Sequence, residues 1–293
     1  PKPVLTKALL PKTRTDEDKI SNALKRLCEE DLTLRVERKA ESHELLVSAM
    51  GQIHLDVTLE RMKRRFGVEV NVNTQKVPYR ETIQGTTKVQ GRHKKQSGGR
   101  GQFGDIWIEI SPLEKGGGFI FEDNIVGGAI PKTYIPAVKK GIKEAMDAGV
   151  VAGCPMVDIK IRLYDGSYHD VDSSEIAFKI AGSIGFKKGV PDCRPTLLEP
   201  IMVMDVTVPS EFVGDIMGDL NSKRGKVRGI DANNDLQNIQ AEVPMSEVLN
   251  YSADLNSMTS GKGVFTMDFD HYYKVPEHLK EKIIEESQKD NVE

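Results

Sequence analysis

The sequence has few of the residues that build metal, disulfide or redox sites. Its 293 residues include three cysteines, at positions 28, 154 and 193, and it has no C-x-x-C or H-x-x-x-H pair. A disulfide framework and a zinc site are therefore not expected. Sparse, widely spaced cysteines are typical of a reducing compartment, so we expect a cytoplasmic protein.

Long apolar runs and a phosphate-binding loop are also missing. No run approaches the ~20 apolar residues of a membrane span, so we expect no membrane partner. The pattern G-x-x-x-x-G-K-[ST] does not occur, which argues against a nucleotide-binding P-loop. Residues 215–218, DIMG, fit the short D-x-x-G pattern of GTP-binding proteins. Because Ile216 and Met217 fall on the apolar face of a predicted helix, we interpret this match as chance.

An excess of positive charge is missing as well. The chain has 41 basic and 44 acidic residues and a net charge of −3, so any nucleic-acid surface must be local. The length predicts two or three domains, and 38% hydrophobic with 29% charged residues is typical of a globular protein. The N-terminus, PKPVLTKALL, enters a strand at once, and we expect it to continue from a longer protein.

Two parts of the chain share one order of predicted elements. Residues 1–82 and 198–274 each predict strand, helix, two strands, helix, strand, from period-2 and period-3.6 apolar patterns. Each is predicted to be a ferredoxin-like βαββαβ sandwich. We expect Thr15 with Asp18 to cap the first helix, and Ser210 to cap the helix that follows residue 209. Residues 83–197 differ, with four strand-like segments and two helices, the second capped by Ser173. The expected fold class is α+β.

The stretch 98–104, GGRGQFG, contains Gly99-x-Gly101-x-x-Gly104, the spacing of a dinucleotide-binding turn. Such a turn must follow a strand and open a helix. Here DIWIEI follows, which predicts a strand, so we expect a hairpin loop. Five basic residues and no acid lie in residues 84–104, and that run favours contact with phosphate groups. The alternative is a solvated, charged hairpin.

Two further segments are candidates. Residues 164–175, YDGSYHDVDSSE, contain Ser, His and Asp, but no G-x-S-x-G elbow accompanies them, and a metal site at His169, Asp170 and Asp172 would lack a fourth ligand. We expect no catalytic residue there; His169 either stacks on or bonds to a base or is an exposed loop histidine. Residues 221–229, NSKRGKVRG, predict either RNA phosphate contact or an ordinary basic turn.

Several segments occur together, in order, in one known family. They are EEDLTLRVER, MGQIHLDVTLERMKRRFGVEV, VPYRETI, KKQSGGRGQFGD, GAIPKTYIPAVKKGI, GSYHDVDSSEIAFKIAG, LLEPIMVMDVTVP, GDIMGDLNSKRGKVRGI and AEVPMSEVLNYSADLNSMTSGKG. They cover nearly the whole chain and resemble the third, fourth and fifth domains of bacterial translation elongation factor G or an elongation-factor-G-like protein.

The resemblance implies three domains. They are a ferredoxin-like domain over 1–82, a domain similar to the second domain of ribosomal protein S5 over 83–197 plus 275–293, and a ferredoxin-like domain over 198–274. It implies a module that binds the ribosome, with 16S and 23S rRNA, stalk-base proteins, tRNA and mRNA as partners, in a monomeric protein. The parent would be a GTPase with GTP and Mg on a domain absent here, so this chain is expected to be no enzyme and to hold no cofactor.

The resemblance also implies site residues. The tip of the fourth domain, which enters the decoding region during translocation, corresponds to Lys94, Lys95, Gln96, Ser97, Gly98, Gly99, Arg100, Gly101, Gln102, Ser167, Tyr168, His169 and Asp170. The rRNA-contact candidates of the fifth domain are Lys223, Arg224, Lys226 and Arg228.

Alternatives stay open at this point. Residues 186–200 and the opening segment resemble paralogues of the family, so the parent could act in ribosome recycling or ribosome protection. Hypotheses of other classes are a nucleotide-dependent enzyme that uses the glycine pattern, and a purely structural or protein-interaction fragment.

Overall fold

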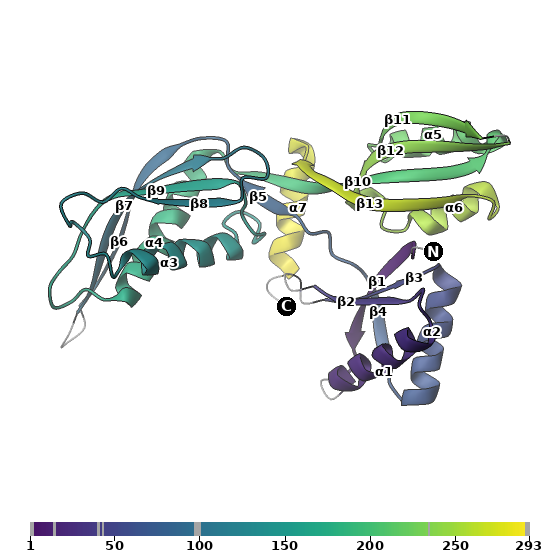
Figure 1. Ribbon diagram of the computed structural model, residues 1–293, viewed down its shortest axis with the longest axis horizontal. Coiled ribbons are helices and arrows are strands. Elements are labelled where there is room, and N and C mark those ends of the chain that lie inside the picture. Colours follow the sequence, from purple (N-terminus) through teal and green to yellow (C-terminus); the bar gives the residue numbers. More distant parts are fainter. Residues whose placement is uncertain are drawn as a thin grey trace. The chain divides into compact units, whose positions relative to one another are not determined.

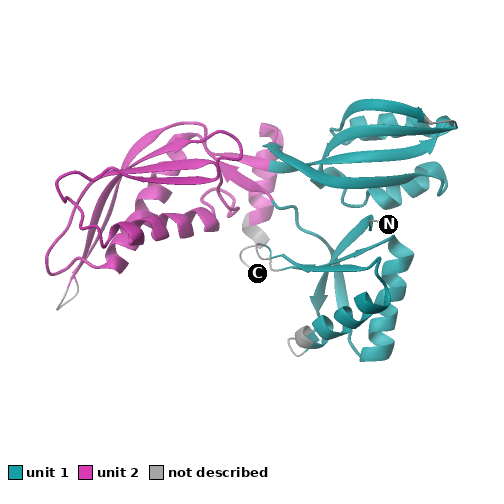
Figure 2. Ribbon diagram, in the orientation of Figure 1, with its two compact units in different colours: residues 1–78, 199–273 teal, residues 79–198, 274–293 magenta. Residues whose placement is uncertain are grey.

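The computed structural model describes residues 3–13, 16–39, 42, 44–96, 101–233 and 235–290. The chain forms two compact units (Figure 2). Unit 1 comprises residues 1–78 and 199–273, and unit 2 comprises residues 79–198 and 274–293. Within the described residues, no helix is both long enough and apolar enough to cross a membrane.

The first part of unit 1 is a four-stranded sheet with two helices (Figure 1). Its elements are β1 (Leu5–Pro11), α1 (Glu17–Glu30), β2 (Arg35–Arg38), β3 (Leu45–Ala49), α2 (Gln52–Phe66) and β4 (Val70–Thr74). The strand order is β2-β3-β1-β4 with antiparallel pairs. The apolar stripe of α1, which includes Ile20 and Leu24, packs with Leu55 and Met62 of α2 in one buried cluster. Helix α2 ends at Gly67, whose φ of +64° suits glycine.

The second part of unit 1 repeats this arrangement. Its elements are β10 (Thr196–Pro209), α5 (Val213–Ser222), β11 (Lys226–Asn233), β12 (Leu236–Pro244), α6 (Tyr251–Thr259) and β13 (Val264–Lys274). The order β11-β12-β10-β13 is the same permutation as in the first sheet. In each sheet, the two strands that one helix connects are separated by an antiparallel strand inserted between them. Both parts are therefore ferredoxin-like sandwiches, as the sequence predicts.

Unit 2 is built on a third sheet. Its elements are β5 (Arg80–Thr82), β6 (Thr87–Lys95), β7 (Gln102–Pro112), β8 (Phe119–Asp123), α3 (Ile135–Ala148), β9 (Ile159–Ser167), α4 (Glu175–Gly189) and α7 (Glu277–Asp290). The order is β6-β7-β9-β8, and β8 and β9 are parallel, with α3 between them in the chain. The inward face of β7, with Ile106, Ile108 and Ile110, packs with Phe178 and Phe186 of α4.

Strand β5 and helix α7 complete unit 2 through a second, smaller cluster. Residues 80–82 pair with the first three residues of β10. The carboxylate of Glu81 is fully buried and accepts four backbone N–H groups, from residues 150, 151, 152 and 154, at 2.8–3.0 Å. Val275 and Ile283 pack with Ala152 and Leu197. The sequence predicts domain boundaries near 82, 197 and 274, whereas the units change at 78, 198 and 273, and the division of unit 1 into two domains stays a prediction.

Two predicted helix caps are wrong. Ser210 lies in a short 3-10 turn before α5 and donates its hydroxyl to the Asp235 carbonyl at 3.2 Å. Helix α4 is capped by Ser174, whose Oγ accepts the Ala177 N–H at 3.2 Å, and not by Ser173. Ser173 is buried and bonds elsewhere, as described below. Thr15, the third predicted cap, lies outside the described residues.

Candidate nucleic-acid interface

The two predicted tip loops lie at one end of the unit 2 sheet. The first loop joins β6 to β7, which pair up to Lys95 opposite Gln102. The second loop, residues 168–173, follows β9, and Ser167 at the end of β9 pairs with Asp105 of β7. The sheet therefore brings together two segments that are far apart in sequence. Of the predicted residues, Ser97, Gly98, Gly99 and Arg100 lie outside the described residues.

Hydrogen bonds tie the two loops together. The Gly101 N–H donates to Asp172 Oδ1 at 2.9 Å, and the Phe103 N–H donates to the Asp172 carbonyl at 2.9 Å. The Ser173 hydroxyl donates to the Phe103 carbonyl at 2.9 Å. At the base of the tip, the Ser167 hydroxyl donates to Asp105 Oδ2 at 2.9 Å. The exit of the first loop is thus held on the second.

His169 lies on the exposed side of the second loop, with 57% of its side chain accessible. Its Nδ1 accepts the N–H groups of Val171 and Asp172 at 3.3 Å each. Its backbone N–H donates to Ser173 Oγ at 2.9 Å, and its carbonyl accepts the Ser173 N–H at 3.0 Å. Its neighbours Tyr168 and Asp170 are exposed. The loop therefore presents an exposed ring whose Nδ1 is already engaged by the backbone.

The basic side chains of β6 divide into two groups. Lys94, Lys95 and Gln96 are exposed, and neither lysine has an ion-pair partner among the described residues. Lower on the strand, Lys88 Nζ lies 3.6 Å from the carboxylate of Glu109, and the Arg92 guanidinium lies 5.6 Å from the ring centre of Phe103. Part of the acid-free run in the sequence is therefore neutralised across the sheet, and the uncompensated charge lies toward the tip.

The glycine pattern has a packing explanation. Gly104 lies in β7, and a Cβ there would come within 2.7 Å of the Ala177 carbonyl oxygen in α4. Gly101 donates its N–H to Asp172. The described part of the pattern, from Gly101 on, leads into β7 and not into a helix, so it does not supply the helix N-terminus that a dinucleotide turn requires. Nor do the hydrogen bonds of the described residues place any serine hydroxyl on the His169 ring, as a Ser-His-Asp site would need.

The second basic segment, in unit 1, has mostly internal partners. Arg224, at φ +59°, donates from both terminal nitrogens to the buried carboxylate of Glu199 at 2.7 and 2.9 Å, and from Nε to Glu247 at 2.9 Å. The hydrogen bond with Glu199 raises the pKa of this guanidinium. Lys223 Nζ lies 2.7 Å from Asp219. Lys226 and Arg228 are exposed, and Arg228 pairs with Glu242. The exposed members, Lys226 and Arg228, are the better placed for an outside partner.

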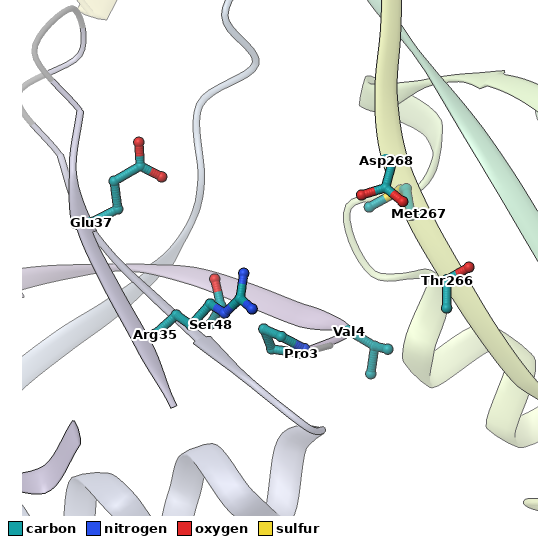
Figure 3. A pocket seen from close by; sticks show the side chains of 8 residues that line it. All are labelled: Pro3, Val4, Arg35, Glu37, Ser48, Thr266, Met267 and Asp268. Carbon is teal, nitrogen blue, oxygen red and sulfur yellow. The ribbon is translucent and has the colours of Figure 1, made fainter. Parts of the chain in front are cut away.

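Unit 1 holds two other features that could form a site. A pocket of about 240 Å³ is lined by Pro3, Val4, Arg35, Glu37, Ser48, Thr266, Met267 and Asp268 (Figure 3), and no predicted site residue lines it. Glu242, Asp270 and His271 offer ligand atoms within 4.8 Å of one another. The hydrogen bond from His271 lowers the pKa of Asp270, and Arg228 already balances the acids, so the cluster is explained as an ion-pair network.

Three family models match consecutive parts of the chain. Elongation Factor G, domain III matches residues 1–74, Elongation factor G, domain IV matches residues 75–194, and Elongation factor G C-terminus matches residues 196–283. The chain belongs to the elongation factor G family. Its first and last parts are the ferredoxin-like domains III and V of that family, and its middle part is the S5 domain 2-like domain IV.

A solved structure agrees with this assignment. A crystal structure of a protein from Thermus thermophilus is 45% identical and covers 99% of this chain, with a TM-score of 0.87. The chain spans 43% of that protein's length. No model of a GTPase domain is among the three matches.

Sequence reasoning missed the residues that organise the tip. From the sequence, Asp172 is considered as a ligand of an incomplete metal site, and Ser173 is predicted to cap a helix. Their partners, Gly101 and Phe103, are 71 and 70 residues away in sequence, and no local pattern reports that pairing. The three-residue spacing of His169 and Asp172 is a sequence signal for their contact, because a side chain in a turn often bonds to a backbone group two or three residues away.

Proposed function

We propose that this chain is the ribosome-binding part of a translational GTPase that moves tRNA and mRNA through the ribosome, with the domain IV tip entering the decoding region. The observation that carries the proposal is the pair of tied loops on an elongation factor G domain IV, with Lys94, Lys95, Gln96 and His169 exposed at their ends. GTP hydrolysis would belong to a part of the longer protein outside this chain.

The charge distribution supports RNA as the partner. The net charge of −3 gives no general attraction for nucleic acid, but exposed lysines without acidic partners gather toward the tip. Lysine ammonium groups near phosphates release counterions, which makes such binding weaken with salt. Exposed Tyr168 and His169 offer rings on which an unpaired base can stack. Among the described residues of this surface, no nucleophile is bonded to a base, and this favours a binding role for the tip.

The test uses the longer protein with Gln96→Ala, His169→Ala or Lys95→Ala, in a single-round translocation assay and a ribosome-binding titration. We expect slower tRNA movement for the first two. For Lys95→Ala we expect weaker binding, with a salt slope reduced by roughly one. The matched control is Lys282→Ala, which removes an exposed lysine on α7. Translocation and affinity unchanged by all three tip variants would reject the assigned tip role.

A recycling or protection role is the alternative within the family. An assay of ribosome-subunit splitting by the longer protein separates recycling from translocation, because a recycling factor splits subunits and moves tRNA poorly. Calorimetry of the chain with GTP or a dinucleotide tests the enzyme alternative, for which binding heat at millimolar ligand is the expected signal.

A further inference from the structure

The second tip loop contains a small hydrogen-bond network that links it both to the first loop and to His169. The Asp172 carboxylate accepts the Gly101 N–H at the end of the first loop, and its carbonyl accepts the Phe103 N–H at the start of β7. Ser173 is 4% exposed, and its hydroxyl both donates to the Phe103 carbonyl and accepts the His169 N–H. The Asp172 N–H also donates to His169 Nδ1, so each of these two residues contacts both His169 and the segment 101–103, where the first loop enters β7.

The geometry of the same network favours one tautomer of a neutral His169 ring. Two backbone N–H groups, those of Val171 and Asp172, approach Nδ1 at 3.3 Å. A nitrogen that receives two donors must carry a lone pair and not a proton, and in a neutral imidazole the proton then lies on the other nitrogen. The Asp172 carboxylate lies 3.6 Å from Nδ1, beyond hydrogen-bond range, so the two backbone N–H groups are the hydrogen-bond donors that Nδ1 faces.

We propose that Asp172 and Ser173 are positioning residues that join the two tip loops and hold His169 in the Nε2–H tautomer, so that the tip presents one outward hydrogen-bond donor. The group recognised is then an acceptor on RNA, such as a base carbonyl, a ring nitrogen or a phosphate oxygen. This inference rests on the proposed function for its partner, but the tautomer is a property of the chain alone.

The first test needs no ribosome. Long-range ¹H–¹⁵N spectra of the histidine rings, with the His169 signal assigned from its loss in His169→Gln, report which nitrogen bears the proton. We expect an unprotonated Nδ1 that accepts hydrogen bonds and a protonated Nε2 at neutral pH. A predominant Nδ1–H form, or an even mixture of tautomers, would overturn the proposal.

Variants then separate positioning from folding. Asp172→Ala and Ser173→Ala are expected to give a mixture of tautomers, and Asp172→Asn, which keeps an oxygen for the Gly101 N–H, is expected to restore the single form. The matched control is Ser174→Ala: it removes the α4 cap at the next position, lowers thermal stability, and should leave the tautomer unchanged. The wild-type tautomer in both alanine variants, or its loss in Asp172→Asn and Ser174→Ala, contradicts the proposal.

A double-mutant cycle connects the network to tRNA movement. If Asp172 acts through His169, Asp172→Ala slows single-round translocation by roughly tenfold in the wild-type background and has almost no further effect in His169→Gln. An equal loss in both backgrounds overturns the positioning role. Absence of ribosome binding by the wild-type protein would instead contradict the proposed function, and the ring spectra would still test the tautomer.

Discussion

At the scale of single residues, Arg224 is the partner of a buried acid in unit 1. Arg224 satisfies the carboxylate of Glu199, which is 2% exposed, with two hydrogen bonds, and it also reaches Glu247. The sequence places this arginine in a basic turn that predicts RNA contact, but pairing with a buried acid is a tertiary property. The internal partners of Arg224 are observed, and its contact with rRNA stays a prediction.

Arg224→Ala is expected to lower the free energy of unfolding by about 3–5 kcal/mol, because it leaves a buried carboxylate without its partner. Arg228→Ala, whose side chain is 56% exposed, is expected to cost about 0–1 kcal/mol. Chemical denaturation of both variants measures the difference. Similar losses in the two variants would show that the Glu199 pair does not stabilise unit 1 as described.

At the scale of elements, glycine determines how closely β6 and β7 approach α4. A Cβ on Gly91 would lie 2.3 Å from the Ala181 carbonyl oxygen, and one on Gly104 would lie 2.7 Å from that of Ala177. Both clashes are with helix backbone, which cannot rotate away as a side chain would. The strands and helix therefore fit only because these positions lack a Cβ.

Gly91→Ala is accordingly expected to destabilise unit 2 by about 1–3 kcal/mol through forced backbone movement. The control is Gly218→Ala in α5, where nothing lies within 4 Å of the added methyl group. There alanine should stabilise by about 0.5–1 kcal/mol, because it has the higher helix propensity. Thermal unfolding of the two variants should move in opposite directions, and a shift in the same direction would contradict the packing argument.

The elements show what the sequence could and could not reveal. Both βαββαβ units are readable because the apolar periods of their helices and strands are local. The start of α4 is misplaced by one residue because Ser173 and Ser174 are equally good caps in sequence. Their tertiary bonds distinguish them: Ser173 bonds to the Phe103 carbonyl, and Ser174 accepts the Ala177 N–H. Local sequence patterns also do not predict the loop pairing at the tip or the four N–H groups around Glu81. The bonds from Gly101 and from Ala152 each join residues 71 positions apart.

At the scale of the whole molecule, each unit is made from two separate stretches of chain. Unit 2 takes residues 79–198 and then residues 274–293, after the chain has passed through the second half of unit 1. Figure 1 shows helix α7 at the end of the chain. The helix supplies Ile283, and the segment before it supplies Val275, whose N–H donates to the Leu197 carbonyl at 3.0 Å. The placement of the C-terminal helix with the middle part of the chain is predicted from the family resemblance, and not from any pattern in the sequence of α7.

Ile283→Ala is expected to destabilise unit 2 by about 2–5 kcal/mol, since it removes a buried branched side chain from a small cluster. Lys282→Ala, on the exposed side of the same helix, serves as the control. Hydrogen exchange measured by mass spectrometry should show faster exchange in unit 2 and no change in unit 1. Equal acceleration in both units would mean that α7 stabilises more than its own unit.

The late position of α7 in the chain has a consequence for synthesis. Domains generally fold as they leave the ribosome, N-terminal parts first, at about 5–20 residues per second. The first sheet of unit 1 can form as soon as β4 has emerged, but the cluster around Leu197 stays open to water until residues 275–283 are made. The first stretch of unit 2 is synthesised before residues 199–273, and its second stretch after them. During the translation of these roughly eighty residues, the apolar surface around Leu197 lacks the side chains that later cover it.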